Sequence, residues 1–155
     1  MEILYGKSTK ESEKENMPPV RILIVEDERQ TVDALRDLFE QNGYETEVAL
    51  NKQVALAILQ ERKMDLVIVS TMVQEISGLE ILYEMKKIIP NIPIIVISNQ
   101  KSKRIESSFT KAGANVFIVK PLEASFVLQT IENLLEARFV IAAPKKTKSY
   151  SKSKK

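Results

Sequence analysis

The middle of the chain alternates between short apolar runs and segments whose apolar residues recur with a helical period. The first run, at 21–25, is rich in β-branched residues. Apolar residues then follow at helical spacing from Val32 to Phe39, and Gly43 comes next, which is typical of a helix end. We expect further strands at 45–50, 66–69, 94–97 and 116–119. We expect further helices at 53–62, 79–88, 103–112 and 123–139. In the first of these, Val54, Ala57 and Ile58 give the helical period. The pattern predicts five strand–helix pairs.

Strands and helices that alternate in this way predict one α/β domain. Parallel strands need crossover connections, and right-handed crossovers place helices on both faces of the sheet. In the run at 45–50, Glu45 and Glu47 alternate with other residues as in an edge strand, whereas the other runs are continuously apolar, as in strands covered on both faces. We therefore predict a flavodoxin-like, doubly wound, five-stranded parallel sheet with strand order 2-1-3-4-5 and five helices. In such sheets, ligands bind beyond the carboxyl ends of the strands.

The composition removes several classes of chemistry. The 155 residues suit one domain, and the absence of cysteine and histidine excludes disulfides, thiolate or imidazole metal ligands and serine–histidine triads. Carboxylate, hydroxyl and lysine chemistry remain, together with oxygen-binding metals such as Mg²⁺. No glycine-rich phosphate loop occurs, so we expect no enzyme activity. Because the chain has neither a long apolar run nor a signal peptide, we expect a cytoplasmic protein.

The two ends of the chain differ in composition from the predicted domain at 20–140. Residues 1–19 are polar, hold three lysines and four glutamates and finish with two prolines, which predicts a flexible leader. Residues 141–155 form a tail rich in lysine and serine, with six lysines and no acidic residue, which predicts disorder. Between 20 and 143 there are 14 basic and 17 acidic residues, so the predicted domain is mildly acidic despite the overall net charge of +2.

Four of the five predicted strands end in polar side chains. Glu26 and Asp27 follow the first strand, Ser70 the third, Ser98 the fourth and Lys120 the fifth. The carboxyl ends of parallel strands meet at one edge of a sheet, so we expect these side chains to lie close together. Paired carboxylates suit a hard divalent cation, while a lysine and a hydroxyl suit phosphoryl oxygens. Each residue alone could be a solvated cap, but their convergence favours a binding site.

These residues lie within longer motifs. The motifs are ILIVEDE at 22–28, DLVIVS at 65–70 with GLE at 78–80, PIIVIS at 93–98 and AGANVFIVKP at 112–121. In this order and spacing, residues 20–139 resemble the receiver domain of two-component response regulators. The resemblance implies that the acidic pair Glu26 and Asp27 binds Mg²⁺ together with the main-chain carbonyl of Met72. It also implies that the conserved hydroxyl, the conserved lysine and the aromatic switch residue are Ser98, Lys120 and Phe117.

One departure from the family pattern changes the expected chemistry. Ser70 stands where the resemblance places the phosphoacceptor aspartate, and Gln74 stands where a proline is usual. A neutral hydroxyl must lose a proton before it attacks, and the nearby carboxylates are weak bases. Loss of the third carboxylate also weakens cation binding. We therefore predict a pseudo-receiver that a histidine kinase does not phosphorylate and that binds Mg²⁺ weakly or not at all, with Lys120 facing Glu26 and Asp27.

The predicted function is protein–protein interaction. The resemblance implies a docking face formed by the last two predicted helices and the strand between them, with a histidine kinase or a downstream signalling protein as partner. Ile105, Phe109 and Phe117 are candidate switch or interaction residues on this face. The spacing of Ile105, Phe109 and Phe126 also suits packing in the core, whereas Phe117 is the better candidate for partial exposure.

Alternative functions stay open. The chain could be a working phosphorelay receiver with altered site chemistry, or a Ser/Thr kinase could modify Ser70. The six-lysine tail could bind nucleic acid or another acidic surface through salt-dependent contacts. Specific nucleic-acid recognition is poorly supported, because the tail holds no arginine and one aromatic residue, Tyr150.

Overall fold

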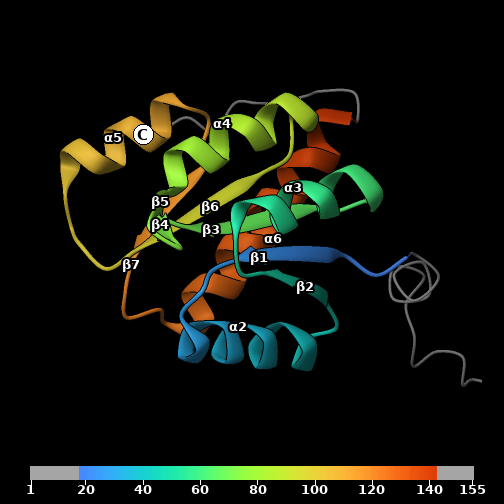
Figure 1. Cartoon of the computed structure of the whole chain (residues 1–155). Helices are drawn as coiled ribbons and strands as arrows, with labels where there is room; N and C mark the ends of the chain where they lie inside the picture. Colours follow the sequence, from blue (N-terminus) through green and yellow to red (C-terminus); the bar gives the residue numbers. More distant parts are fainter. Residues whose placement is uncertain (1–17, 143–155) are drawn as a thin grey trace, which may run out of the picture.

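The protein folds around a five-stranded parallel sheet with strand order β2-β1-β3-β6-β7 (Figure 1). The structure is a computed structural model that describes residues 18–142. The sheet strands, labelled as in Figure 1, are β1 (Arg21–Val25), β2 (Glu45–Ala49), β3 (Leu66–Ser70), β6 (Ile94–Ser98) and β7 (Val116–Val119). All four strand pairs are parallel, and β2 and β7 form the edges. The predicted fold class and the order 2-1-3-4-5 are confirmed.

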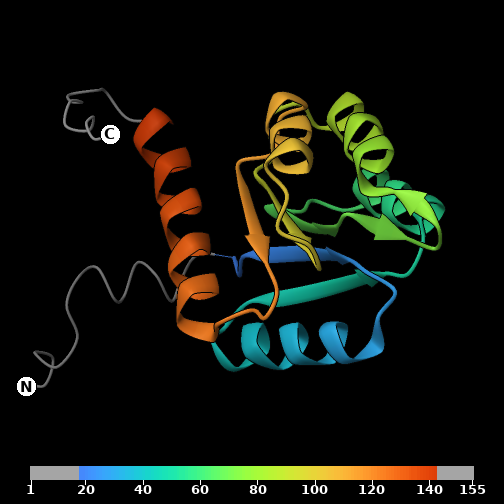
Figure 2. The same ribbon diagram turned by 90° about the vertical axis from the view of Figure 1, so that its left-hand side faces the viewer.

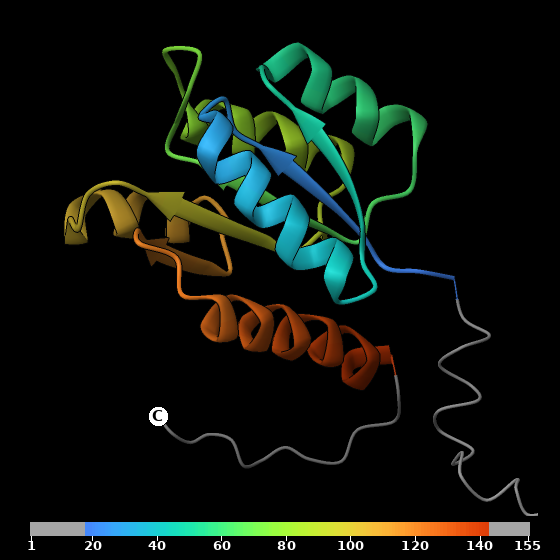
Figure 3. The ribbon, with the colours of Figure 1, turned by 90° about the horizontal axis from the view of Figure 1, so that it is seen from below.

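Five helices cover the two faces of the sheet. They are α2 (Arg29–Gln41), α3 (Lys52–Glu61), α4 (Gly78–Ile88), α5 (Lys103–Lys111) and α6 (Ala124–Ala142). Figures 2 and 3 show α2 and α6 on one face and α3, α4 and α5 on the other. The helix starts follow capping chemistry, because Asn51, Ser77 and Ser102 each accept a backbone N–H of the first turn of α3, α4 or α5. Each such cap contributes about 1 kcal/mol to helix stability.

The core has two parts, one on each side of the sheet. Successive residues of a strand point to opposite faces, so the central strands supply both parts. On the α3–α5 side they contribute Leu23, Val25, Val67, Val69, Ile94 and Val96. On the α2–α6 side they contribute Ile22, Ile24, Leu66, Ile68, Ile95 and Ile97. Because β1, β3 and β6 are covered on both faces, their sequences are continuous apolar runs, as predicted.

Two apolar residues are more exposed than their spacing suggested. The buried residues of α3 are Ala55 and Leu59, and Val54, which was expected to mark the apolar period, is 42% exposed. Six of the ten residues of this helix are apolar and lie consecutively from Val54 to Leu59, so the middle of the helix has no polar face to orient it. Phe126, whose spacing suited the core, is 51% exposed. The face of α6 that packs on the sheet carries Val127 and Ile131, one turn apart, and Phe126 lies beside it.

Two elements of the fold differ from the prediction. A short antiparallel hairpin, β4 (Met72–Val73) and β5 (Ile76–Ser77), lies between β3 and α4 and was not predicted. Helix α6 continues through Ala142, past its predicted end at 139.

Most of the predicted leader and tail, 1–17 and 143–155, lies outside the described residues. None of the helices at 18–142 combines the length and the apolar character that crossing a membrane requires.

Candidate functional site

The polar residues predicted at the strand ends line one cavity of about 530 Å³. Parallel pairing brings them together, since Ser70 in β3 pairs with Ile97 and Ser98 in β6 pairs with Val119. The cavity is lined by all six residues to which the sequence assigned a chemical or metal-binding role, which are Glu26, Asp27, Ser70, Met72, Ser98 and Lys120. The structure therefore brings these six positions together around one cavity.

Another hollow of similar volume, about 550 Å³, lies near the opposite end of β1 and β2. Charged side chains line it, and they are paired with each other as Arg21 with Glu45 and Arg62 with Glu47. The strand-end cavity is the better candidate, because it lies beyond the carboxyl ends of the strands, where ligands bind in sheets of this kind.

Glu26 is the most buried acidic residue of the cavity, with 2% of its surface exposed. Its Oε2 accepts the backbone N–H groups of Asp27 and Glu28, both at 2.9 Å. Its Oε1 lies 3.5 Å from Nζ of Lys120. These donors compensate for the cost of burying the carboxylate. Glu26 therefore holds the loop between β1 and α2 in place.

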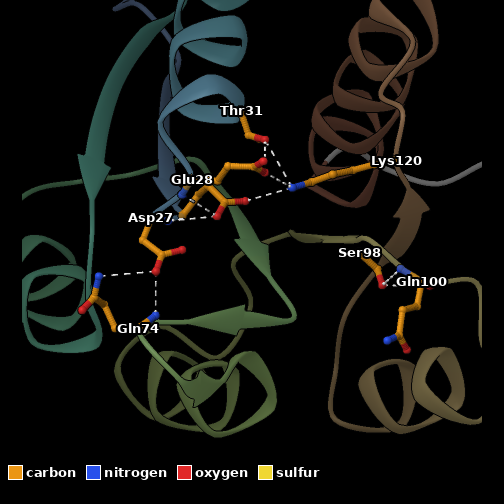
Figure 4. Close-up of polar contacts among 8 residues, drawn as sticks. Asp27, Glu28, Thr31, Gln74, Ser98, Gln100 and Lys120 are labelled. Atoms are coloured by element: carbon orange, nitrogen blue, oxygen red, sulfur yellow. Dashed lines mark hydrogen bonds and ion pairs between the residues drawn. The ribbon is translucent and has the colours of Figure 1, made fainter.

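Lys120 directs its ammonium group toward the start of α2. Nζ lies 2.7 Å from Oε1 of Glu28 and 3.2 Å from Oγ1 of Thr31, and the Thr31 hydroxyl donates to the same Glu28 oxygen at 2.7 Å (Figure 4). The hydrogen bond from Lys120, followed by that from Thr31, holds the pKa of Glu28 below its usual value. Lys120 was expected to face Glu26 and Asp27; it pairs with Glu26 and Glu28 instead.

Asp27 makes its contacts on the other side of the loop. Its Oδ2 accepts the backbone N–H of Gln74 at 3.0 Å and the side-chain Nε2 of Gln74 at 3.3 Å. Figure 4 shows Asp27 directed toward the β4–β5 hairpin, away from Lys120. The two neighbouring acidic residues Glu26 and Asp27 thus have different partners, one from the end of β7 and one from the hairpin.

Ser70 lines the same cavity and is 6% exposed. Within residues 18–142 no hydrogen bond from or to its hydroxyl meets ordinary geometric criteria. Its carbonyl group packs directly against Gly78, the first residue of α4. The Ser70 side chain is therefore a small, neutral, nearly buried hydroxyl at the end of the central strand.

Ser98 is engaged locally. Its hydroxyl donates to the carbonyl oxygen of Gln100 at 2.8 Å and accepts the Gln100 N–H at 3.0 Å. Figure 4 shows this pair apart from the acidic residues. The hydroxyl stabilises the turn after β6, and a ligand that used it would have to displace Gln100.

The candidate switch residues lie next to the cavity. Phe109 is buried and Ile105 is half-buried, and both line the cavity. The half-buried Phe117 ring packs on the α3–α5 side of the core, with its centroid 6.1 Å from that of Phe109. Phe117 is therefore partly exposed, as expected, and its ring packs against Phe109, which lines the cavity.

The family is decided by a comparison with known proteins. A family model for the response regulator receiver domain matches residues 22–132. The chain belongs to this family. This receiver is 31% identical over 119 residues to the polar-differentiation response regulator DivK of Brucella anthropi, covering 76% of this chain and 97% of DivK. It is 34% identical over 115 residues to the chemotaxis protein CheY of Thermotoga maritima, covering 74% of this chain and 96% of CheY.

Solved structures give the same result for the receiver fold. A CheY-like receiver domain protein from Methanospirillum hungatei JF-1 superposes with a TM-score of 0.75 and 26% identity, covering 79% of this chain and 98% of that protein. Other relatives are longer, and the chain spans about half, 51%, of the response regulator MprA of Mycolicibacterium vanbaalenii. Receiver domains are signalling modules that interact with histidine kinases and other signalling proteins, so this receiver has a signalling function.

Receiver domains typically bind Mg²⁺ at the phosphorylation site, but the donor set of this chain does not suit the ion. Mg²⁺ requires several oxygen ligands in near-octahedral geometry. Here the oxygens of Glu26 face donors, Asp27 has one oxygen bound to Gln74, and Ser70 supplies no charge. Met72, whose carbonyl was the predicted further ligand, lines the cavity. In the described part of the chain, no three acidic side chains gather in a way that could hold a metal ion.

Sequence reasoning missed three residues that determine the geometry of the site. Glu28 and Thr31 bind Lys120, and Gln74 binds Asp27. Glu28 and Thr31 lie on one helical turn at the start of α2, a spacing that could have indicated a shared partner. For Gln74 the departure from the family proline was visible, but its contact with Asp27 depends on the unpredicted hairpin.

Proposed function

We propose that this receiver is a docking module that does not take up a phosphoryl group at Ser70. The proposal rests on the resemblance, which aligns Ser70 with the phosphoacceptor aspartate, and on one observation: Ser70 is 6% exposed and has a hydroxyl where an anionic nucleophile would be needed. An aspartate is ionised at neutral pH and attacks without a base, whereas a serine hydroxyl must first be deprotonated.

The neighbouring groups support this proposal because each already has hydrogen-bond partners. The chain has no histidine. The Glu26 carboxylate accepts two backbone N–H groups at 2.9 Å, and Asp27 accepts Gln74. Lys120, which would otherwise meet incoming phosphoryl oxygens, is bound 2.7 Å from Glu28.

Partner binding is proposed for the face formed by α5, β7 and α6. Phe126 is 51% exposed there, and the half-buried Phe117 lies between the two helices in sequence. Lys103, Arg104 and Lys111 are exposed on α5. Aromatic residues with surrounding charges are typical of docking surfaces. The proposed partner is a histidine kinase or a downstream signalling protein with an acidic rim around an apolar centre.

The test of the proposed function is phosphorylation of the intact chain by a small acyl phosphate in the presence of Mg²⁺. The expected result is that the mass of the wild-type chain does not change, while a receiver with an aspartate acceptor treated in parallel gains one phosphoryl group. Fragmentation would locate any adduct. A phosphoryl group found on Ser70 of the wild-type chain would refute the proposal and favour a phosphorelay receiver with altered chemistry.

A further inference from the structure

The β4–β5 hairpin adopts a backbone conformation that its residues do not favour. Gln74 and Glu75, the two residues of its turn, have φ angles of 51° and 62°. Two-residue hairpin turns with positive φ at both positions usually contain glycine or asparagine, because other side chains are strained there. Neither residue is of that kind, so contacts outside the turn must stabilise it.

The contact that does so joins the hairpin to the acidic pair. Both the backbone N–H and the side-chain Nε2 of Gln74 donate to the same oxygen of Asp27, at 3.0 Å and 3.3 Å. The two residues are 47 positions apart in the sequence, so this is a tertiary crosslink between the hairpin and the loop after β1. Figure 4 shows both donors of Gln74 meeting the Asp27 carboxylate.

Two donors on one carboxylate oxygen occupy the lone pairs through which that oxygen would bind a cation. Hydrogen bonds to a charged group are stronger than those between neutral groups. To coordinate Asp27 through that oxygen, a cation would have to break both bonds and release the hairpin turn. The arrangement depends on residue type, because a proline at 74 has no N–H and its φ is fixed near −65°, opposite in sign to the observed 51°.

We propose that Gln74 blocks cation binding at Oδ2 of Asp27 and is a second determinant of the site, separate from Ser70. The inference rests on the proposed function, since it concerns the same site. It states that changing Ser70 to an acidic residue is not sufficient to create a good Mg²⁺ site. Gln74 acts as a positioning residue here, because it works through Asp27 and the hairpin.

The test uses the full-length chain and Mg²⁺ titrated by isothermal calorimetry. The variants are Ser70→Asp alone and Ser70→Asp combined with Gln74→Ala, Gln74→Pro or Glu75→Ala. Gln74→Ala removes one donor and Gln74→Pro removes both, whereas Glu75→Ala is the matched control in the same strained turn. We expect the Gln74→Ala combination to bind Mg²⁺ more tightly than Ser70→Asp alone, and the Gln74→Pro combination to bind about tenfold more tightly. The Glu75→Ala combination should match Ser70→Asp.

A second readout is independent of metal. Amide hydrogen exchange at residue 74 should accelerate in Asp27→Ala without Mg²⁺, because the acceptor of this N–H is lost. Equal Mg²⁺ affinity of Ser70→Asp and both Gln74 combinations would overturn the inference, as would unchanged exchange. If the proline variant does not fold, the alanine variant decides. A phosphoryl adduct on wild-type Ser70 would instead refute the proposed function, whatever the Gln74 variants show.

Discussion

Substitution of Gly78 tests how closely the site is packed against α4. Gly78 is the first residue of that helix, and its N–H donates to the carbonyl oxygen of Thr71 at 2.7 Å. A Cβ at this position would overlap the carbonyl oxygen of Ser70 and lie 3.1 Å from its carbonyl carbon and 3.2 Å from that of Thr71. These are backbone atoms of the strand end, so no side-chain rotation relieves the clash.

The magnitude follows from this geometry. An alanine near the start of a helix would normally be neutral or stabilising relative to glycine. Inserting one carbon into a closely packed region costs about 1–3 kcal/mol, and a clash with backbone lies at the upper end of that range. We therefore expect Gly78→Ala to lower the free energy of unfolding by about 3 kcal/mol. For a domain of this size, the corresponding fall in Tm is about 6–12 °C.

The assay is urea and thermal unfolding followed by circular dichroism, with Gly43→Ala as the control. Gly43 has a φ of 87°, and no atom lies within 4 Å of the point that a methyl group would occupy there, so its substitution adds backbone strain without a clash. We expect Gly43→Ala to cost about 1–2 kcal/mol. If Gly78→Ala were no more destabilising than Gly43→Ala, the close approach of α4 to Ser70 would be refuted.

Three further predictions concern charged residues. Glu26→Ala should lower the free energy of unfolding by about 2–4 kcal/mol in urea titrations, since it leaves two backbone N–H groups without their acceptor, whereas the exposed Asp27→Ala should cost less. The Glu28→Gln variant should have a lower free energy of unfolding than wild type above pH 4.5. This difference should vanish as the pH falls through the lowered folded pKa of Glu28, and a difference that stays constant with pH would contradict the pairing with Lys120. The Lys52→Met variant should be less stable than wild type, with the full difference present below pH 10.5. Hydrogen bonds to two glutamates of α4 raise the folded pKa of Lys52, so the difference should close as the pH rises through that pKa; thermal scans across pH measure it.

The fold was predictable because burial dictates the residue types of the central strands. A strand covered on both faces has no polar positions, so β1, β3 and β6 appear in the sequence as unbroken apolar runs. The orientation of α3 was not predictable in the same way. Its residues are nearly all apolar from Val54 to Leu59, and the choice of Ala55 and Leu59 as the buried pair depends on the position of the helix on the sheet.

The site was predictable in its positions and not in its contacts. Parallel strands bring their carboxyl ends together whatever side chains they carry, so the convergence of Glu26, Ser70 and Lys120 followed from topology. The partner of Lys120 depends on which acidic residue its flexible side chain reaches. The partner of Asp27 depends on a hairpin whose turn residues give no turn signal, because neither is glycine, asparagine or proline.

The central claim is that Ser70 does not take up a phosphoryl group, so that a phosphoryl analogue with Mg²⁺, which would switch an aspartate-bearing receiver, should leave this receiver unchanged. The most direct measurement is a two-dimensional amide NMR spectrum of the full-length chain with and without beryllofluoride and Mg²⁺. The account predicts superimposable spectra. Shifts that spread from Ser70 to Ser98 and Phe117 on adding both reagents would contradict it.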